Sequence, residues 1–255
     1  MAIKGVLLDL SGVLYVGDEA LPGAAAALER LRMLDLPVRF ITNTTRSPRR
    51  KILYQLEQMG LDVPEHELFT APAAVRDVLI ERGLRPALLI HPGLREEFDD
   101  FDVSDPNAVV IGDAGDAFDY QHMNRAFRLL MEGAEFIAMG NNRYFREADG
   151  LSLDVGPFVL ALEYATGRKA VILGKPSPAF FHQAVASMGI EPENVLMVGD
   201  DVTADVQGAI EAGLMAALVR TGKYRQADEN GLRDTQAWIE DDVSAVVERL
   251  IEEAE

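Results

Sequence analysis

Short apolar runs alternate along the chain with segments whose apolar residues recur at helical spacing. The first run, Val6 to Leu8, is apolar on both faces and stops at Asp9, which is typical of a buried strand. Further strands are predicted at Val38–Thr42, Ala170–Leu173, Val195–Val198 and Met215–Val219. Helices are predicted between them at Pro22–Leu34, at Ser47–Met59, from Ser177-Pro178 onward and at Thr203–Ala212. This alternation predicts an α/β fold with a doubly wound parallel sheet.

A second, smaller α/β series interrupts the first. Phe69–Arg82 reads as a short strand and a helix closed by Gly83, and Arg85-Pro86 then opens the new series. Its strands are predicted at Ala87–His91, Ala108–Gly112 and Glu135–Met139, and its helices at Tyr120–Met131 and Gly156–Thr166. We therefore expect a core domain made of residues 1–83 and 171–255, with an α/β domain inserted at 84–170. The polar, acidic segment Tyr224–Asp242 is predicted to be an irregular surface before a last helix.

Composition narrows the functional classes. The 255 residues are 48% hydrophobic, enough to bury a full core, and the absence of cysteine excludes disulfides and thiolate chemistry. A formal net charge of -18 argues against nucleic acid or an anionic membrane as partner. Without a recognisable secretory signal or a membrane-length apolar stretch, we expect a cytoplasmic protein. The same charge means that an anionic substrate would need a local cation or a metal ion.

Two groups of polar residues stand where predicted strands end. Asp9 ends the first strand, and Thr42, Asn43 and Thr44 end the second. In an open α/β sheet, ligands bind at the carboxyl ends of the strands, so all four are candidates for chemistry. The hydroxyls, the amide and the backbone N–H groups of the second group could bind a phosphoryl oxygen. Taken alone, Asp9 could equally be a solvated strand terminus, and the second group an ordinary polar cap.

Two later strand ends carry charged groups. Lys175 lies between a predicted strand and a capped helix, where it could be a fixed positive charge or an ordinary surface lysine. Asp200, Asp201 and Asp205 follow the strand Val195–Val198, and carboxylates so close together repel one another unless a cation or hydrogen bonds intervene. Clustered oxygen ligands suit Mg²⁺, which is the cofactor we expect. The alternative is that Asp201 only caps the following helix.

These four groups follow one another in the order of a known family. The chain resembles the haloacid dehalogenase-type (HAD) phosphatases, whose motifs carry an aspartate nucleophile, a Thr or Ser, a Lys and an acidic pair. The insertion between Thr42 and Lys175 resembles the large α/β cap of the second cap class (class IIA) in that superfamily. The stretches DLSGVLY, FITNTT, GKPSPAFF, MVGDD and VRTGKYR are similar to the phospholysine phosphohistidine inorganic pyrophosphate phosphatase group.

The resemblance implies a Mg²⁺-dependent phosphatase that acts on phospholysine, phosphohistidine or inorganic pyrophosphate through an aspartyl phosphate. The implied catalytic residues are Asp9 and Lys175. The implied substrate-binding residues are Ser11, Thr42, Asn43, Thr44 and Lys175. The implied metal ligands are Asp9, Ser11 through its carbonyl, Asp200 and Asp205, with Asp201 in support. The substrate would be a small phosphorylated molecule or a phosphorylated side chain, and a homodimer is implied, with the cap as a candidate interface.

Ser11 departs from the wider superfamily, which usually has an aspartate as general acid and base two positions after the nucleophile. A serine hydroxyl donates a proton poorly at neutral pH, and losing general acid catalysis costs roughly 10²- to 10⁴-fold in rate. Substrates whose leaving group needs no proton from the enzyme are then favoured. Phosphoramidates and pyrophosphate meet that condition, whereas simple alkyl phosphates do not.

Two alternatives remain open at this stage. The chain could be a HAD phosphatase of other small phosphate esters, or a non-catalytic phosphate binder in which Ser11 marks a decayed site. A signalling receiver domain is excluded, because its acidic pair comes first in the chain and no insertion separates its Thr from its Lys. His91 and Arg143, in loops of the inserted unit, are further candidates for substrate contact, and the four histidines show no spacing for a metal.

Overall fold

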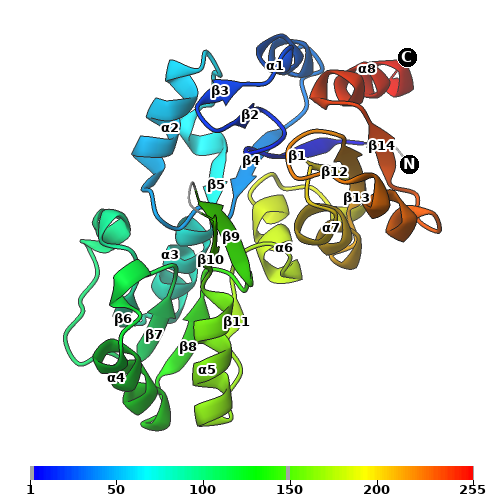
Figure 1. Cartoon of the computed structure of the whole chain (residues 1–255). Coiled ribbons are helices and arrows are strands. Elements are labelled where there is room, and N and C mark those ends of the chain that lie inside the picture. Colours follow the sequence, from blue (N-terminus) through cyan, green and yellow to red (C-terminus); the bar gives the residue numbers. More distant parts are fainter. Residues whose placement is uncertain (1–2, 148–149, 255) are drawn as a thin grey trace. The chain divides into compact units, whose positions relative to one another are not determined.

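The structure is a computed structural model that describes residues 3–147 and 150–254, and the chain divides into two compact units (Figure 1). The first comprises Met1–Thr42, Arg50–Phe69 and Lys175–Glu255, and the second comprises Asn43–Arg49 and Thr70–Gly174. Because the second unit is inserted in the sequence of the first, the first is assembled from segments far apart in the chain. That an inserted domain at 84–170 acts as a cap stays a prediction.

A six-stranded sheet forms the centre of the first unit. Its strand order is β14-β13-β12-β1-β4-β5, and β1 pairs in parallel with both β12 and β4. The strands are β1 (Gly5–Asp9), β4 (Val38–Thr42), β5 (Leu68–Thr70), β12 (Val195–Gly199), β13 (Met215–Val219) and β14 (Trp238–Glu240). All residues of β1 and β12 are buried, as the unbroken apolar runs predicted. The expected parallel α/β sheet is confirmed, but the strand predicted at Ala170–Leu173 is not part of it, because residues 171–172 pair in the sheet of the second unit.

Helices surround this sheet. They are α1 (Ala24–Arg32), α2 (Arg49–Gln58), α6 (Pro178–Ala186), α7 (Gly208–Glu211) and α8 (Val243–Ala254), with the 3-10 helices Glu65–Glu67, Pro192–Asn194 and Gln226–Leu232. Val6 and Leu8 of β1 belong to the core cluster that the apolar faces of α1, α2 and α8 complete. Leu7, also fully buried, points to the opposite face of the sheet because side chains alternate along a strand. Both faces of the sheet are therefore covered, so a ligand can reach the sheet only at the ends of its strands.

The second unit contains its own parallel sheet in the order β11-β8-β7-β6. Its strands are β6 (Pro86–Leu89), β7 (Ala108–Ile111), β8 (Glu135–Ala138) and β11 (Val171–Ile172). Its helices are α3 (Ala71–Arg82), α4 (Tyr120–Met131) and α5 (Gly156–Thr166), with 3-10 helices Pro92–Phe98 and Gly115–Ala117. Left-handed Gly83 and Gly167 end α3 and α5, as the sequence predicted. A second core, which includes Val109 and Phe136, lies between this sheet and its helices.

Three local expectations are corrected or extended by the structure. Residues 224–242 are not simply irregular surface: they form the 3-10 helix Gln226–Leu232 and the strand β14, which pairs in parallel with β13 and buries Trp238. Three residues are too few to show a period, so the pattern missed this strand. The hairpins β2 (Tyr15–Val16) with β3 (Glu19–Ala20), and β9 (Tyr144–Glu147) with β10 (Gly150–Leu153), were also not predicted.

The helix predicted at Thr203–Ala212 is present in another form. Val202–Gln207 is a π-helix, and the short α7 continues it. Asp201 caps the π-helix, since its Oδ1 accepts hydrogen bonds from the N–H groups of Thr203 at 3.0 Å and Ala204 at 2.9 Å. Wide π-turns are rare and are frequent at functional sites. Among the helices described, none combines the length and the apolarity needed to cross a bilayer.

Candidate active site

Asp9 lies where the strand order of the first unit reverses. The chain runs from β1 to β4 on one side and returns through β12 on the other, so β1 and β12 are the strands at the topological switch point. Asp9 is the last residue of β1 and only 7% exposed. Asp200 directly follows β12 and is 1% exposed. Two strands thus present buried carboxylates to the point where doubly wound sheets bind ligands.

Lys175 joins two of the buried carboxylates. Its Nζ lies 2.7 Å from Asp9 Oδ1 and 2.7 Å from Asp205 Oδ1, and the lysine is 3% exposed. Asp205 projects from the π-helix and is fully buried, and its Oδ2 accepts a hydrogen bond from the Asp201 N–H at 3.1 Å. The alternative that Lys175 is a surface lysine is excluded. The strand end after β11 and the helix after β12 therefore supply opposite charges to one cluster.

The electrostatics of this cluster follow from burial. Burial raises the pKa of Asp9 above its ordinary value, although Lys175 opposes the shift. Burial also raises the pKa of Asp200 to about 6 and that of Asp205 to about 6. For Lys175, burial alone would lower the pKa, but Asp205 and Asp9 outweigh it and raise the pKa. The lysine is therefore a permanent cation, whereas burial destabilises the ionised carboxylates, which further positive charge would stabilise.

The donor set fits a divalent cation. Asp9, Asp200 and Asp205 each offer a carboxylate oxygen, and these oxygens lie within 4.8 Å of one another. Three carboxylates and one lysine ammonium leave two negative charges uncompensated. Asp200 Oδ1 is buried and has no hydrogen-bond partner within the described parts of the chain. An orphaned, buried carboxylate oxygen beside two further acidic ligands suits a hard ion such as Mg²⁺.

The loop after β13 orients Asp200, and the sequence assigned it no role. The N–H of Lys223 donates to Asp200 Oδ2 at 2.6 Å, and the Thr221 hydroxyl donates to the carbonyl of Gly12. A Cβ on Gly222 would lie 2.0 Å from Asp200 Oδ2 and 2.5 Å from Gly12 Cα, so glycine is required there. The stretch VRTGKYR carried part of the family resemblance, and that was the available signal.

Comparisons with known proteins agree with this geometry. A family model described as haloacid dehalogenase-like hydrolase matches residues 6–104, and one described as HAD-hydrolase-like matches residues 172–246. The phospholysine phosphohistidine inorganic pyrophosphate phosphatase of Homo sapiens is 46% identical over 99% of this chain and 96% of its own length. The chain belongs to the haloacid dehalogenase-like hydrolase family. It is a phosphohydrolase of that family, as the motifs predicted.

Other relatives of this hydrolase carry the same name or different names. The phosphatase of the same name from Rattus norvegicus is 50% identical over 89% of this chain and 87% of its own. The haloacid dehalogenase-like hydrolase domain-containing protein 2 of Bos taurus is 48% identical over 90% of this chain and 88% of its own. The 4-nitrophenylphosphatase of Thermotoga maritima shares the fold with a TM-score of 0.87, at 28% identity over 96% of this chain and 97% of its own. Sequence similarity therefore spans relatives with and without a named substrate.

The remaining predicted residues of this hydrolase lie in two units. Thr42, at the end of β4, is buried in the first unit, and Ser11 is exposed just after β1. Asn43 and Thr44 are half-buried residues of the second unit. In that unit Arg143 is exposed. The structure thus groups Asp9, Lys175, Asp200 and Asp205, whereas joint substrate binding by the loop residues stays a prediction.

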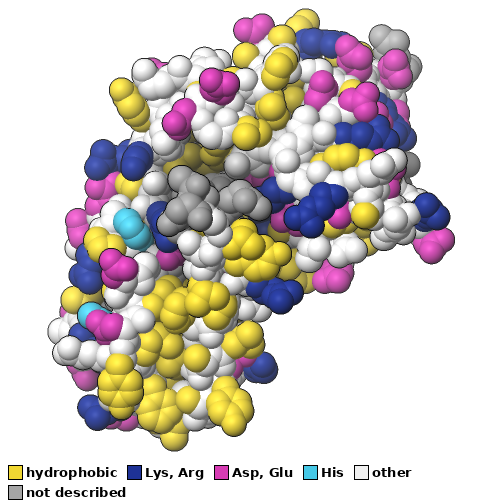
Figure 2. All heavy atoms as spheres, in the orientation of Figure 1, with side chains coloured by type: hydrophobic (Ala, Val, Ile, Leu, Met, Phe, Trp, Pro, Cys, Tyr) yellow, Lys and Arg dark blue, Asp and Glu magenta, His cyan; other side chains and the backbone are white. Residues whose placement is uncertain are grey.

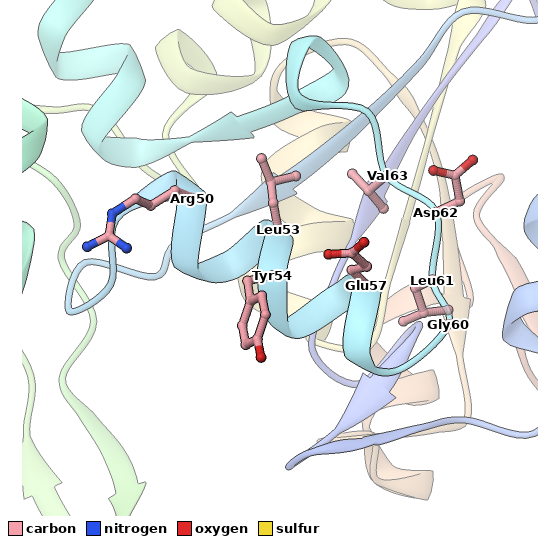
Figure 3. A pocket seen from close by; sticks show the side chains of 8 residues that line it. All are labelled: Arg50, Leu53, Tyr54, Glu57, Gly60, Leu61, Asp62 and Val63. Atoms are coloured by element: carbon pink, nitrogen blue, oxygen red, sulfur yellow. The ribbon is translucent and has the colours of Figure 1, made fainter.

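Two other features of this hydrolase stand outside the carboxylate cluster. His91, a further candidate from the sequence, caps the 3-10 helix Pro92–Phe98, because its Nδ1 accepts the Gly93 N–H at 3.1 Å. A hollow of about 560 Å³ lies along α2 (Figure 3) and is lined by Arg50, Leu53, Tyr54, Glu57, Gly60, Leu61, Asp62 and Val63. None of these lining residues belongs to the carboxylate cluster.

Proposed function

We propose that this hydrolase is a Mg²⁺-dependent phosphatase that acts through an aspartyl phosphate on Asp9. The observation that supports it most is the buried cluster in which Lys175 pairs with Asp9 and Asp205 beside the orphaned oxygen of Asp200. Phosphoryl transfer requires mainly positioning and charge neutralisation, and this cluster combines a fixed carboxylate with a fixed cation. Bound Mg²⁺, held by Asp9, Asp200, Asp205 and the Ser11 carbonyl, would supply further neutralisation of the phosphoryl oxygens.

The chain's own residues account for two chemical steps. An oxygen of the Asp9 carboxylate attacks phosphorus, and the bond from phosphorus to the leaving nitrogen or oxygen breaks with its electron pair on the leaving atom. A water oxygen then attacks the same phosphorus, which releases inorganic phosphate and restores the Asp9 carboxylate. Lys175 stays charged throughout and stabilises the negative charge at both stages. Thr42, Asn43 and Thr44 would hold phosphoryl oxygens through hydroxyl, amide and backbone donors.

We propose phosphoramidates and inorganic pyrophosphate as the substrates. Relatives 46–50% identical are named for phospholysine, phosphohistidine and pyrophosphate. The exposed Ser11 hydroxyl supplies no efficient acid for the leaving group, so substrates with competent leaving groups are favoured. A phosphoramidate nitrogen can take its proton from solvent, and pyrophosphate releases a stabilised anion. The 4-nitrophenyl phosphate for which the structural neighbour is named also has a good leaving group, so it can serve as a reference substrate with a single phosphoryl group.

The proposal also covers assembly and location. Hydrophobic side chains gather over α5 and the hairpin of the second unit (Figure 2), and Leu151, Leu153, Leu160 and Tyr164 are all more than half exposed. A contiguous apolar surface of this kind is typical of protein interfaces. It supports a homodimer formed through the second unit, which the mass in solution would test. A cytoplasmic location and the lack of nucleic-acid and membrane partners rest on composition and charge.

The decisive experiment measures phosphate release by the purified protein with pyrophosphate, phosphohistidine, phospholysine and an alkyl phosphate. We expect Mg²⁺-dependent turnover of the first three, loss of turnover in EDTA, and no turnover by Asp9→Asn. The amide of this variant is a far weaker nucleophile of nearly the same size, so the fold should persist. A folded Asp9→Asn protein that retained more than a few per cent of activity would remove Asp9 from the role. Wild-type protein without activity on any substrate would favour the non-catalytic binder.

A further inference from the structure

A second lysine of the first unit lies at the solvent side of the carboxylate cluster. Lys223 Nζ is 3.5 Å from Asp201 Oδ2, and the lysine side chain is 70% exposed. Its backbone is fixed, because the Lys223 N–H donates to Asp200 Oδ2 at 2.6 Å. Lys175, by contrast, is 4% exposed as a side chain and is already paired with Asp9 and Asp205. The two lysines therefore have different surroundings.

Lys223 is held beside the carboxylate cluster at two points. Its Nζ faces Asp201 Oδ2 at 3.5 Å, and its backbone N–H donates to Asp200 Oδ2 at 2.6 Å. The ammonium can exchange its contact with Asp201 for another anion without leaving solvent. The single ion pair at 3.5 Å is long and exposed, and such pairs contribute little to stability. Little free energy therefore opposes the exchange.

We propose that Lys223 is a specificity-determining residue that selects substrates with a second anionic group beside the transferred phosphoryl group. Inorganic pyrophosphate is the simplest member of this class. This inference rests on the proposed function, in which Asp9 and Lys175 handle the phosphoryl group that is transferred. The second phosphate then extends toward solvent, where Lys223 replaces its contact with Asp201 by a charge-assisted hydrogen bond. A substrate with a single phosphoryl group, such as 4-nitrophenyl phosphate, offers Lys223 no such partner.

The alternative is that Lys223 makes no contact with substrate and only offsets the charge of Asp201. In that case its removal would affect all anionic substrates alike, because a general change in local potential does not distinguish them. A contact with the second phosphate would instead change the ratio between substrates. The ratio of kcat/KM for pyrophosphate to kcat/KM for 4-nitrophenyl phosphate, at fixed free Mg²⁺, therefore separates the two readings.

The test uses Lys223→Gln in the full-length protein. We expect this ratio to fall roughly tenfold, mainly through a higher KM for pyrophosphate, as the loss of one charge-assisted hydrogen bond implies. Lys223→Arg keeps the charge and should keep the ratio within about threefold. Asp201→Asn frees the ammonium while its amide oxygen can still cap the π-helix, so it should raise the ratio. Lys4→Gln is the matched charge control, since Lys4 lies just before the amino end of β1, whereas Asp9 lies at the carboxyl end of the same strand.

An unchanged ratio in Lys223→Gln, with Mg²⁺ binding intact, would overturn the inference. An equal loss on both substrates would do the same and would leave Lys223 as a partner of Asp201. If the wild type hydrolyses neither substrate, the proposed function fails. The role of Lys223 is then tested separately, by measuring the binding of phosphate compounds. Calorimetry with imidodiphosphate and orthophosphate in Mg²⁺ should then show a roughly tenfold weaker affinity of Lys223→Gln for imidodiphosphate alone. Equal affinities of variant and wild type for imidodiphosphate would refute the proposed contact between Lys223 and the second phosphate.

Discussion

Replacing Asp200 by asparagine should stabilise the metal-free protein at neutral pH. Burial raises the pKa of Asp200 to about 6, from an ordinary value of 3.8. As pH rises, the unfolded chain therefore loses this proton before the folded chain does. The stability that the protonated Asp200 carboxyl contributes to the folded protein is fully present below about pH 4 and is lost as pH rises through 6. Two pKa units at 1.36 kcal/mol each make the ionised carboxylate cost about 3 kcal/mol at pH 7.

Asparagine has nearly the same shape and carries no charge. Its amide oxygen can still accept the hydrogen bond from the Lys223 N–H, so the main effect of Asp200→Asn is the removal of a buried, uncompensated charge. In EDTA we expect the variant to be more stable than the wild type by about 2 to 3 kcal/mol at pH 7 and by about 1 kcal/mol at pH 4.5. Mg²⁺ should reverse the order at pH 7, because a ligand that binds only the folded state stabilises it.

Urea unfolding at the two pH values, with EDTA or with Mg²⁺, measures these differences. The single tryptophan, Trp238, is buried in β14, so its fluorescence reports the unfolding of the unit that contains the site. Asp201→Asn is the matched control, because it removes one charge from the same loop and keeps an oxygen for the cap. The reasoning is wrong if metal-free Asp200→Asn is less stable than wild type at pH 7, or if Mg²⁺ stabilises both proteins equally.

Two further predictions concern the surroundings of the cluster. Gly222→Ala should lower kcat/KM by roughly a hundredfold, because its Cβ would displace the Asp200 carboxylate, whereas Gly213→Ala should change it less than about threefold. Both glycines have positive φ, but a Cβ on Gly213 meets nothing within 4 Å, so equal effects would point to backbone strain alone. Ser11→Asp should raise the rate ratio of an alkyl phosphate to pyrophosphate roughly tenfold or more, since it restores a general acid. A flat ratio in a folded, Mg²⁺-binding protein would show that leaving-group chemistry does not govern selectivity.

Local patterns in the sequence were enough to predict most of the helices and strands. The apolar run before Asp9 and the run Val195–Val198 became the two fully buried central strands, because only a strand covered on both faces tolerates unbroken apolar residues. Proline and glycine signals placed the ends of α5 and α6, since their backbone preferences act over one or two residues. The order of the motifs further indicated the family, which the comparisons confirmed.

Contacts between distant segments were decided only by the tertiary structure. Residues 9, 175 and 205 meet through the order of the strands, and nothing local to Lys175 distinguishes a buried ion pair from a surface lysine. β14 forms because β13 offers it a partner, although its three residues have no period of their own. The loop that carries Gly222 and Lys223 gained its role in the same way, because its hydrogen bonds join it to Asp200, 23 residues away, and to Gly12, 209 residues away. Sequence thus supplied the chemical groups, and the fold brought them within reach of one another, because burial and pairing energies arise only when separate elements pack.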